Sequence, residues 1–287
     1  MTTFSTFFPK TSTLTCKGKL LDLSSPKVMG ILNVTPDSFY DAGRYNDEKS
    51  ILAQVEKMLT EGAAIIDIGG MSSRPGAKII AIEEELQRVI PAIETVHKHF
   101  PSAIISIDTI HSKVAKYAIE AGAAMINDIS AGSIDEELMA SVAQLKVPYV
   151  LMHLQGQREN MQTQVQYNDL IQDIIAYFER KIAQLQQHGV HDILLDIGFG
   201  FGKTQNHNYQ LLKQLKDFQI FGLPILCGIS RKSMIYNLLE IDAANALNGS
   251  TVAHTIALLN GCQLLRVHDV KEAVEAIRIT ETIREVK

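Results

Sequence analysis

Basic side chains stand near the ends of apolar runs at several points of this chain. Arg74, Arg266 and His268 are three of them, and Ser73 places a hydroxyl beside the first. Arg266 and His268 are two residues apart, so in a β-strand both would point to the same face. A single residue of this kind usually forms a surface salt bridge. Three at matching positions instead indicate a binding site for an anion such as a phosphate group.

A second set of residues at the ends of apolar runs is acidic or amide: Asp108, Asn127 and Asp196. Carboxylates beside buried strands need hydrogen-bond partners, because burial of an unpaired charge is costly. Nearby backbone groups could be those partners, a structural role that we expect for Asp67 and Asp128. A planar heterocycle with a guanidine-like edge would also supply donors for two carboxylates and an amide.

Lys232 follows another apolar run, in the segment Gly228–Ser233. A lysine there could be a Schiff-base nucleophile, a phosphate ligand or a hydrogen-bond donor. Its position alone does not choose among the three.

The segment Gly198–Thr204 ends in Gly-Lys-Thr, like a nucleotide-binding P-loop. The first glycine of that motif would fall at Ile197, however, and no helix is expected directly after the segment. We therefore predict a glycine-hinged loop that carries Phe199 and Phe201 over a pocket.

Eight apolar, β-branched runs predict the strands that would position these side chains. They lie at 28–32, 63–68, 103–107, 123–126, 147–152, 192–197, 224–229 and 262–267, with helical patterns between them at 50–59, 83–97, 112–120, 170–186 and 243–259. Apolar strands that alternate with helices predict a parallel sheet covered by helices.

Polar residues follow most of these runs, and they converge only if the strands form a ring. This indicates an α/β fold of the (β/α)8 TIM-barrel type, with its site on the C-terminal rim. Residues 13–23 predict a short hairpin that closes one end. No linker divides the chain, so we expect a single domain over 1–287, with the barrel at 28–287.

The composition of the chain argues against two kinds of binding partner, nucleic acids and membranes. A net charge of −5 argues against a nucleic-acid surface, and no apolar run is long enough to span a membrane. The three cysteines, Cys16, Cys227 and Cys262, form no Cys-x-x-Cys pair, which suits a reducing compartment. We expect a cytoplasmic protein without a signal peptide.

The chain resembles the dihydropteroate synthase family, enzymes of the folate pathway, from Val28 onward. The matching motifs are Asn33-Val34-Thr35-Pro36-Asp37-Ser38-Phe39, Ser72-Ser73-Arg74-Pro75-Gly76, Ile107-Asp108-Thr109, Asn127-Asp128, Asp196-Ile197-Gly198-Phe199-Gly200-Phe201-Gly202-Lys203, Ser230-Arg231-Lys232-Ser233 and Arg266-Val267-His268. The resemblance implies Mg2+-assisted condensation of 6-hydroxymethyl-7,8-dihydropterin diphosphate with 4-aminobenzoate. It also implies a homodimer and a target for sulfonamides.

The resemblance also implies roles for individual residues. The pterin ring would be bound by Asp108, Asn127, Met152, Asp196 and Lys232, and the diphosphate by Asn33, Ser73, Arg74, Arg266 and His268. The aminobenzoate pocket would include Ser73, Arg74, Pro75, Phe201, Ser230 and Lys232. Asn33 would be the metal ligand, and Asp108, Asp196, Lys232 and Asp41 would act in catalysis, with Asp41 on a lid beyond Pro36.

The sequence departs from the family pattern where Met71 stands in place of glutamate, Ser73 in place of threonine and Ile197 in place of proline. Ala42 replaces a glycine, which reduces backbone freedom there. The remaining alternatives are a pterin-binding methyltransferase acting with a corrinoid protein, a Schiff-base aldolase using Lys232, and a pterin-binding protein without catalytic activity.

Overall fold

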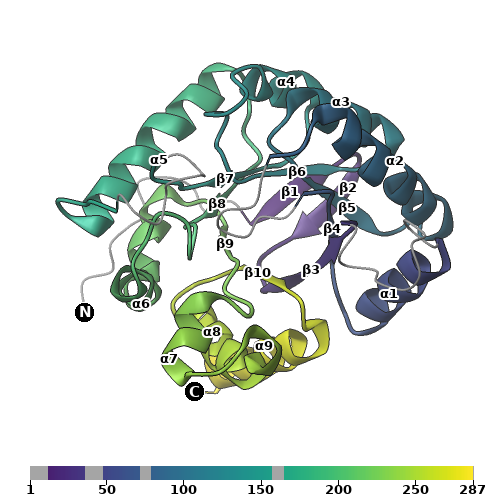
Figure 1. The fold of residues 1–287 in the computed structure, drawn as a ribbon. Coiled ribbons are helices and arrows are strands. Elements are labelled where there is room, and N and C mark those ends of the chain that lie inside the picture. The colour runs from purple at the N-terminus through teal and green to yellow at the C-terminus, as the bar shows by residue number, and fades with distance from the viewer. Residues whose placement is uncertain (1–11, 36–47, 72–78, 157–164, 287) are drawn as a thin grey trace.

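The computed structural model describes residues 12–35, 48–71, 79–156 and 165–286. Eight parallel strands form a closed barrel in the order β10-β3-β4-β5-β6-β7-β8-β9, and helices surround it (Figure 1). The strands are β3 (Lys27–Asn33), β4 (Ile65–Gly69), β5 (Ile104–Asp108), β6 (Met125–Asp128), β7 (Tyr149–Met152), β8 (Ile193–Asp196), β9 (Ile225–Cys227) and β10 (Leu264–Val267). The predicted (β/α)8 barrel is confirmed.

The helices of the described residues alternate with these strands. They are α1 (Glu48–Thr60), α2 (Ile82–His99), α3 (Ser112–Ala121), α4 (Leu138–Leu145), α5 (Leu170–Gln187), α6 (Gln205–Lys213), α7 (Ser233–Leu239), α8 (Leu247–Leu259) and α9 (Val270–Glu285), with short 3-10 turns η1 (Leu215–Phe221) and η2 (Ala243–Asn245). None of these helices is both long and apolar enough to cross a membrane.

Two of the helix predictions need correction. The helix expected over 243–259 begins later, because the Asp242 side chain accepts a hydrogen bond from the Asn245 amide and closes η2 as a separate turn. A helix does follow the glycine loop directly, since Thr204 caps α6 in a reciprocal pair with His207. The rejection of a P-loop therefore rests on the glycine spacing alone.

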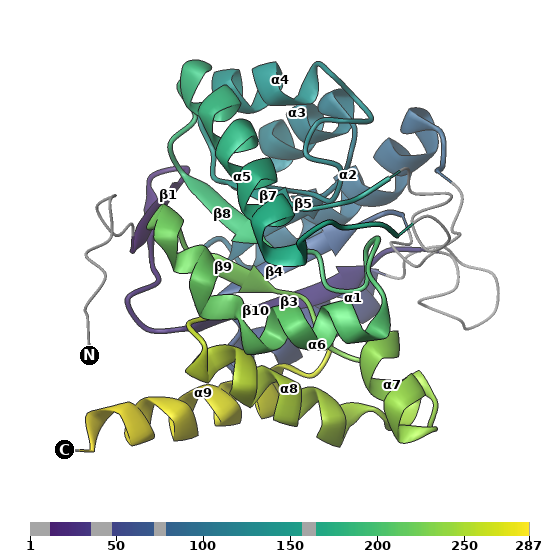
Figure 2. The ribbon, with the colours of Figure 1, turned by 90° about the vertical axis from the view of Figure 1, so that its left-hand side faces the viewer.

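The N-terminal hairpin, β1 (Thr13–Cys16) and β2 (Lys19–Asp22), closes the end of the barrel where the strands begin. Figure 2 shows β1 beside one end of the barrel. The Thr15 amide donates to Asp192, just before β8, and the hairpin's apolar side chains pack into the lumen around Met29 and Ile65. Because this end is filled, a ligand must enter from the opposite rim.

Register aligns the polar side chains at that rim. Asn33, Gly69, Asp108 and Asn127 are successive partners across four neighbouring strands. Alternate residues of each strand face either the helices or the lumen. The polar side chains at the strand ends therefore share one level of the lumen.

Candidate active site

On one side of the barrel mouth, Arg266 is bound by two carboxylates. Its Nε donates to Asp67 Oδ2 at 2.6 Å, and its Nη2 donates to Asp108 Oδ2 at 2.7 Å. Asn127 Nδ2 donates to the same Asp67 oxygen at 2.9 Å. Burial lowers the pKa of Arg266, but the two carboxylates raise it further, so the guanidinium stays charged. Four strands thus meet in one charged network.

On the other side, Lys232 donates to the carbonyl oxygen of Phe199 and lies 4.5 Å from the centroid of the Phe201 ring. The ammonium–ring distance is that of a cation–π contact. Nearby, Asp196 Oδ1 accepts from the Gly198 amide at 2.8 Å. Burial lowers the pKa of Lys232 to about 8, although the Asp196 charge opposes that shift. Burial also raises the pKa of Asp196.

Ser230 and His268 lie together at the rim beside this second group. The Ser230 hydroxyl is 3.2 Å from His268 Nδ1, and the His268 amide donates to the same hydroxyl. His268 is exposed, so its ring can reach a ligand in solvent. The mouth of the barrel therefore offers carboxylates, an amide, a lysine over an aromatic ring, and basic groups for an anion.

Comparison with known proteins agrees with this chemistry. The family model of pterin binding enzymes matches residues 29–268. The dihydropteroate synthase of Escherichia coli K12 is 45% identical over 276 residues, which cover 96% of this chain and 97% of that protein. The chain belongs to the dihydropteroate synthase family. It is accordingly a transferase of folate biosynthesis.

Solved dihydropteroate synthases share its fold. The Yersinia pestis enzyme in a sulfonamide drug complex superposes with a TM-score of 0.90 at 44% identity, covering 96% of this chain and 100% of that one. The Xanthomonas albilineans dihydropteroate synthase with 4-aminobenzoic acid gives a TM-score of 0.90 at 38% identity, covering 96% and 99%.

The structure places most of the predicted site residues at the same rim of the barrel. Those placed there are Asn33, Asp108, Asn127, Met152, Asp196, Phe201, Ser230, Lys232, Arg266 and His268. Asp41, Ser73, Arg74 and Pro75 lie outside the described residues, as does the predicted lid beyond Pro36. The roles of all these residues stay predictions.

A small apolar patch joins Met152 to Phe201 at the mouth. The same cluster contains Met71, Ile110 and Ile129. Met71 is buried there, where the family pattern has glutamate. The substitution replaces a carboxylate by a side chain that extends the apolar wall of the mouth.

Asp67, for which the sequence predicts a structural role, belongs to the charged network at the mouth. Its carboxylate is fully buried and accepts from both Arg266 and Asn127. Asp67 Oδ1 has no hydrogen-bond partner among the described residues. Asp67 lies two residues before the end of β4, which was a weak signal, because its contact with Arg266 joins residues 199 apart in the sequence. Asp128 does have the structural role predicted for it: it accepts from Ser130, Gly132 and Tyr149.

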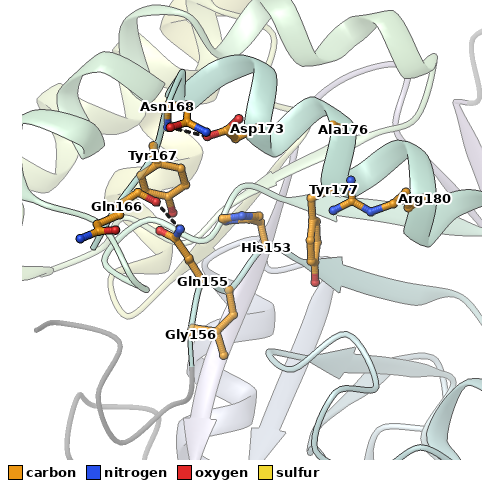
Figure 3. A pocket seen from close by; sticks show the side chains of 11 residues that line it. His153, Gln155, Gly156, Gln166, Tyr167, Asn168, Asp173, Ala176, Tyr177 and Arg180 are labelled. Atoms are coloured by element: carbon orange, nitrogen blue, oxygen red, sulfur yellow. Dashed lines mark hydrogen bonds between the residues drawn. The ribbon is translucent and has the colours of Figure 1, made fainter. Parts of the chain in front are cut away.

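A polar cavity of about 520 Å3 lies next to the site, between β7 and the start of α5. In Figure 3 the side chain of His153 lies between those of Tyr167 and Tyr177 in this region. The His153 and Tyr177 rings meet edge to face at a centroid distance of 4.7 Å. This aromatic group supports the loops of the second side of the mouth.

Proposed function

We propose that the barrel mouth condenses 6-hydroxymethyl-7,8-dihydropterin diphosphate with 4-aminobenzoate, giving 7,8-dihydropteroate and diphosphate. The observation that carries this proposal is the meeting of Asp108, Asn127 and Arg266 in one network, with Lys232 and Asp196 across the mouth. Hydrogen-bond acceptors for a heterocycle and cations for a leaving group then lie within one site.

Asp108, Asn127 and Asp196 would bind the pterin. The guanidine-like edge of the ring presents several N–H donors, which carboxylates and an amide oxygen accept. Lys232 would donate to an acceptor of the ring, because its ammonium already lies beside the Asp196 carboxylate and over the Phe201 ring. Met152 would contact the ring through the apolar patch.

Arg266 and His268 would bind the diphosphate. The contacts with Asp67 and Asp108 use two of the N–H donors of Arg266 and leave the rest of the guanidinium for an anion. Positive groups beside the leaving oxygen lower the barrier, because negative charge develops there in the transition state.

Mg2+ would be held by Asn33 together with the diphosphate. Within the described residues no three His, Cys, Asp or Glu side chains gather as a metal site. Asn33 Oδ1 and Asp108 Oδ2 both lie 3.6 Å from where a Cβ on Gly69 would stand, so the missing side chain leaves room between two oxygens. Such a set suits Mg2+, which keeps waters and binds mainly through substrate phosphates. When bound, it would neutralise charge on the departing diphosphate.

Phe201, Ser230 and Lys232 would form the aminobenzoate pocket. The amine of aminobenzoate is a weak nucleophile, so we propose that the C–O bond breaks first and its electron pair leaves with diphosphate. Asp108 and Asp196 then stabilise the cationic carbon conjugated with the pterin. The amine forms the C–N bond and loses its proton.

Product formation tests the reaction. The purified protein, incubated with the pterin diphosphate, 4-aminobenzoate and Mg2+, should release dihydropteroate and diphosphate in equal amounts. Absence of both products would contradict the proposed function. Sulfonamides should compete with aminobenzoate, and inhibition that does not change with aminobenzoate concentration would contradict the pocket.

Positional isotope exchange tests the order of bond breaking. With 18O at the bridging oxygen of the pterin diphosphate, scrambling should occur without aminobenzoate if the bond breaks first. A strict requirement for aminobenzoate in any scrambling or diphosphate release would contradict the dissociative path.

We also propose that the enzyme is a homodimer, with a second copy packed on α8 and α9. Val252, Ile256 and Leu259 form an exposed apolar stripe on α8, and Ile279 and Ile283 continue it on α9. Helix α8 contains no Lys, Arg, Asp or Glu, so two copies can meet there without like charges opposing. Light scattering should give a dimer that Ile256→Glu converts to monomer; a monomeric wild type would contradict this.

We place the enzyme in the cytoplasm. All three cysteines are free and buried, as suits a reducing compartment. Fractionation of cells followed by detection of the protein tests this location.

A further inference from the structure

Lys203 is a buried lysine whose partners are all uncharged. The residue is 3% exposed. The ammonium donates to the carbonyl oxygen of Phe201 at 2.9 Å, to the carbonyl oxygen of His153 at 3.3 Å and to His153 Nδ1 at 2.9 Å. Because an ammonium has no acceptor, Nδ1 accepts and the His153 proton lies on Nε2. Burial lowers the pKa of His153 well below its usual value, in keeping with a neutral ring.

Two lysines donate to carbonyl oxygens of the loop at 198–203. Lys232 donates to the carbonyl oxygen of Phe199, and Lys203 donates to that of Phe201. The Phe201 ring lies 4.5 Å from the Lys232 ammonium, and the carbonyl oxygen of the same residue accepts from Lys203. Neither lysine alone fixes both ends of the segment that carries this ring.

We propose that Lys203 is a positioning residue for the aminobenzoate pocket. It fixes the backbone at Phe201, and through that backbone it sets the ring against Lys232. The inference rests on the proposed function, in which Phe201 and Lys232 contact aminobenzoate. Lys203 itself touches neither substrate.

The His153 ring, which accepts a hydrogen bond from Lys203, is held in place by neighbouring aromatic rings. The His153 ring meets the Tyr177 ring edge to face at 4.7 Å and lies 6.1 Å from the Tyr167 ring (Figure 3). The hydroxyl of Tyr167 donates to the carbonyl oxygen of Gly202 at 2.9 Å, and that of Tyr177 to Met152 at 3.1 Å. The loop is therefore hydrogen-bonded to the β7–α5 segment at Gly202 and Lys203.

The two segments also approach each other too closely for side chains. A Cβ on Gly198 would lie 2.1 Å from the His153 carbonyl oxygen, and one on Gly202 would lie 2.6 Å from that of Gln155. Both glycines have positive φ angles, of 73° and 61°. This close stacking places buried carbonyl oxygens beside one another, and the Lys203 ammonium supplies the donor that satisfies two of them.

The buried ammonium of Lys203 lowers the stability of the fold, which supports a role for this residue other than stabilisation. Burial lowers the pKa of Lys203 to about 7, and the Asp196 charge only partly opposes this. A buried charge without a carboxylate in hydrogen-bond contact is unfavourable. An apolar side chain of similar length would avoid that cost, but it would leave the Phe201 carbonyl unheld.

The test is a comparison of steady-state constants for both substrates. Lys203→Met should raise the KM for aminobenzoate by about tenfold, the size expected when charge-assisted hydrogen bonds are lost. The kcat and the KM for the pterin diphosphate should change by less than about threefold. Lys213→Met, at an exposed site on α6, is the matched control and should change none of the constants.

Two further variants test the positioning role independently of Lys203→Met. Tyr167→Phe removes one tie to Gly202 without touching a charge and should raise the aminobenzoate KM by about threefold, even if Lys203→Met fails to fold. Phe201→Ala removes the ring itself and should raise that KM by more than Lys203→Met does.

The outcomes separate the inference from the function on which it rests. If Phe201→Ala raises the aminobenzoate KM but neither Lys203→Met nor Tyr167→Phe does, the positioning role is wrong and the pocket stands. If Lys203→Met lowers kcat or raises both KM values equally, the positioning role is also wrong. If Phe201→Ala leaves the aminobenzoate KM unchanged, the pocket and this inference fail together.

Discussion

The two sides of the barrel mouth hold their cations in different ways. On the side of β4, β5 and β10, the Arg266 guanidinium is bound by the carboxylates of Asp67 and Asp108 at 2.6 and 2.7 Å. On the side of β8 and β9, the ammonium groups of Lys203 and Lys232 donate to main-chain carbonyl oxygens. One side thus pairs opposite charges through direct hydrogen bonds, whereas on the other side the ammonium groups hydrogen-bond to uncharged carbonyl oxygens.

This difference decides which charges can be lost. The two carboxylates raise the pKa of Arg266 more than burial lowers it, so that charge is permanent. Burial lowers the pKa of Lys232 to about 8 and that of Lys203 to about 7. Arg266, which is proposed to bind diphosphate, keeps its charge at any physiological pH, whereas the two lysines on the other side can lose theirs.

Removal of the permanent charge should have the largest effect. Arg266→Met leaves Asp67 and Asp108 buried without a counter-charge, which we expect to lower the free energy of unfolding by about 3–5 kcal/mol. The kcat/KM for the pterin diphosphate should fall by about a thousandfold or more, the loss of an electrostatic contact to a leaving group. Urea unfolding measures the free energy of unfolding, and initial rates measure kcat/KM.

Lys113→Met is the control for that experiment. Lys113 forms an exposed pair with Glu83 at 3.2 Å, so its loss should leave the urea midpoint and the rates unchanged. If Arg266→Met were as stable as the control, charge pairing would not distinguish this side of the mouth.

A carboxylate next to the site should have a smaller effect, confined to stability. Asp128 accepts from the amides of Ser130 and Gly132 and from the Tyr149 hydroxyl, and it faces away from the mouth. Asp128→Asn keeps the size of the side chain but places an amide N–H against these donors. We expect a loss of about 2 kcal/mol in urea unfolding with both KM values unchanged; a selective rise in the pterin KM would place Asp128 in the site.

On the side of β8 and β9, the buried lysine Lys203 should make the free energy of unfolding depend on pH. Between pH 7 and 10.5, the unfolded chain binds a proton at Lys203 that the folded chain has released, because folding lowers the pKa of Lys203 from 10.5 to about 7. Stability therefore rises with pH in this range, by up to about 1.4 kcal/mol per pH unit from Lys203. Arg266 stays charged in this range, because its two carboxylates raise its pKa.

Urea unfolding at pH 7, 8 and 9 measures this slope. Lys203→Met should make the slope smaller than in the wild type, while Lys213→Met should keep it. Equal slopes in the wild type and Lys203→Met would mean that Lys203 is not charged at a cost in the folded protein.

The sequence predicted the site residues at strand ends better than those inside a strand or a loop. Asp108, Asn127 and Asp196 could be placed because each directly ends an apolar run, and strand ends converge in a barrel. The role of Asp67 could not be predicted, since its contact with Arg266 depends on the register of distant strands. It lies inside its strand, where a buried acid more often has a structural role.

Lys203 was missed for a different reason. It stands in a Gly-Lys-Thr sequence, which drew attention to phosphate binding rather than to backbone contacts. Its true partners lie on His153, 50 residues earlier, and on Phe201, two residues earlier. Only the packing of the two loops brings these groups together, and a sequence pattern does not show which loops pack against each other.

A crossed titration tests most directly whether Phe201 on one side of the mouth contacts aminobenzoate while Asp108 on the other side contacts only the pterin. The binding of 6-hydroxymethylpterin and the KM for aminobenzoate would be measured in Asp108→Asn and in Phe201→Ala. We predict that Asp108→Asn weakens pterin binding by about tenfold or more and changes the aminobenzoate KM little, and that Phe201→Ala does the reverse. Equal losses for both substrates in either variant would contradict the division of the site.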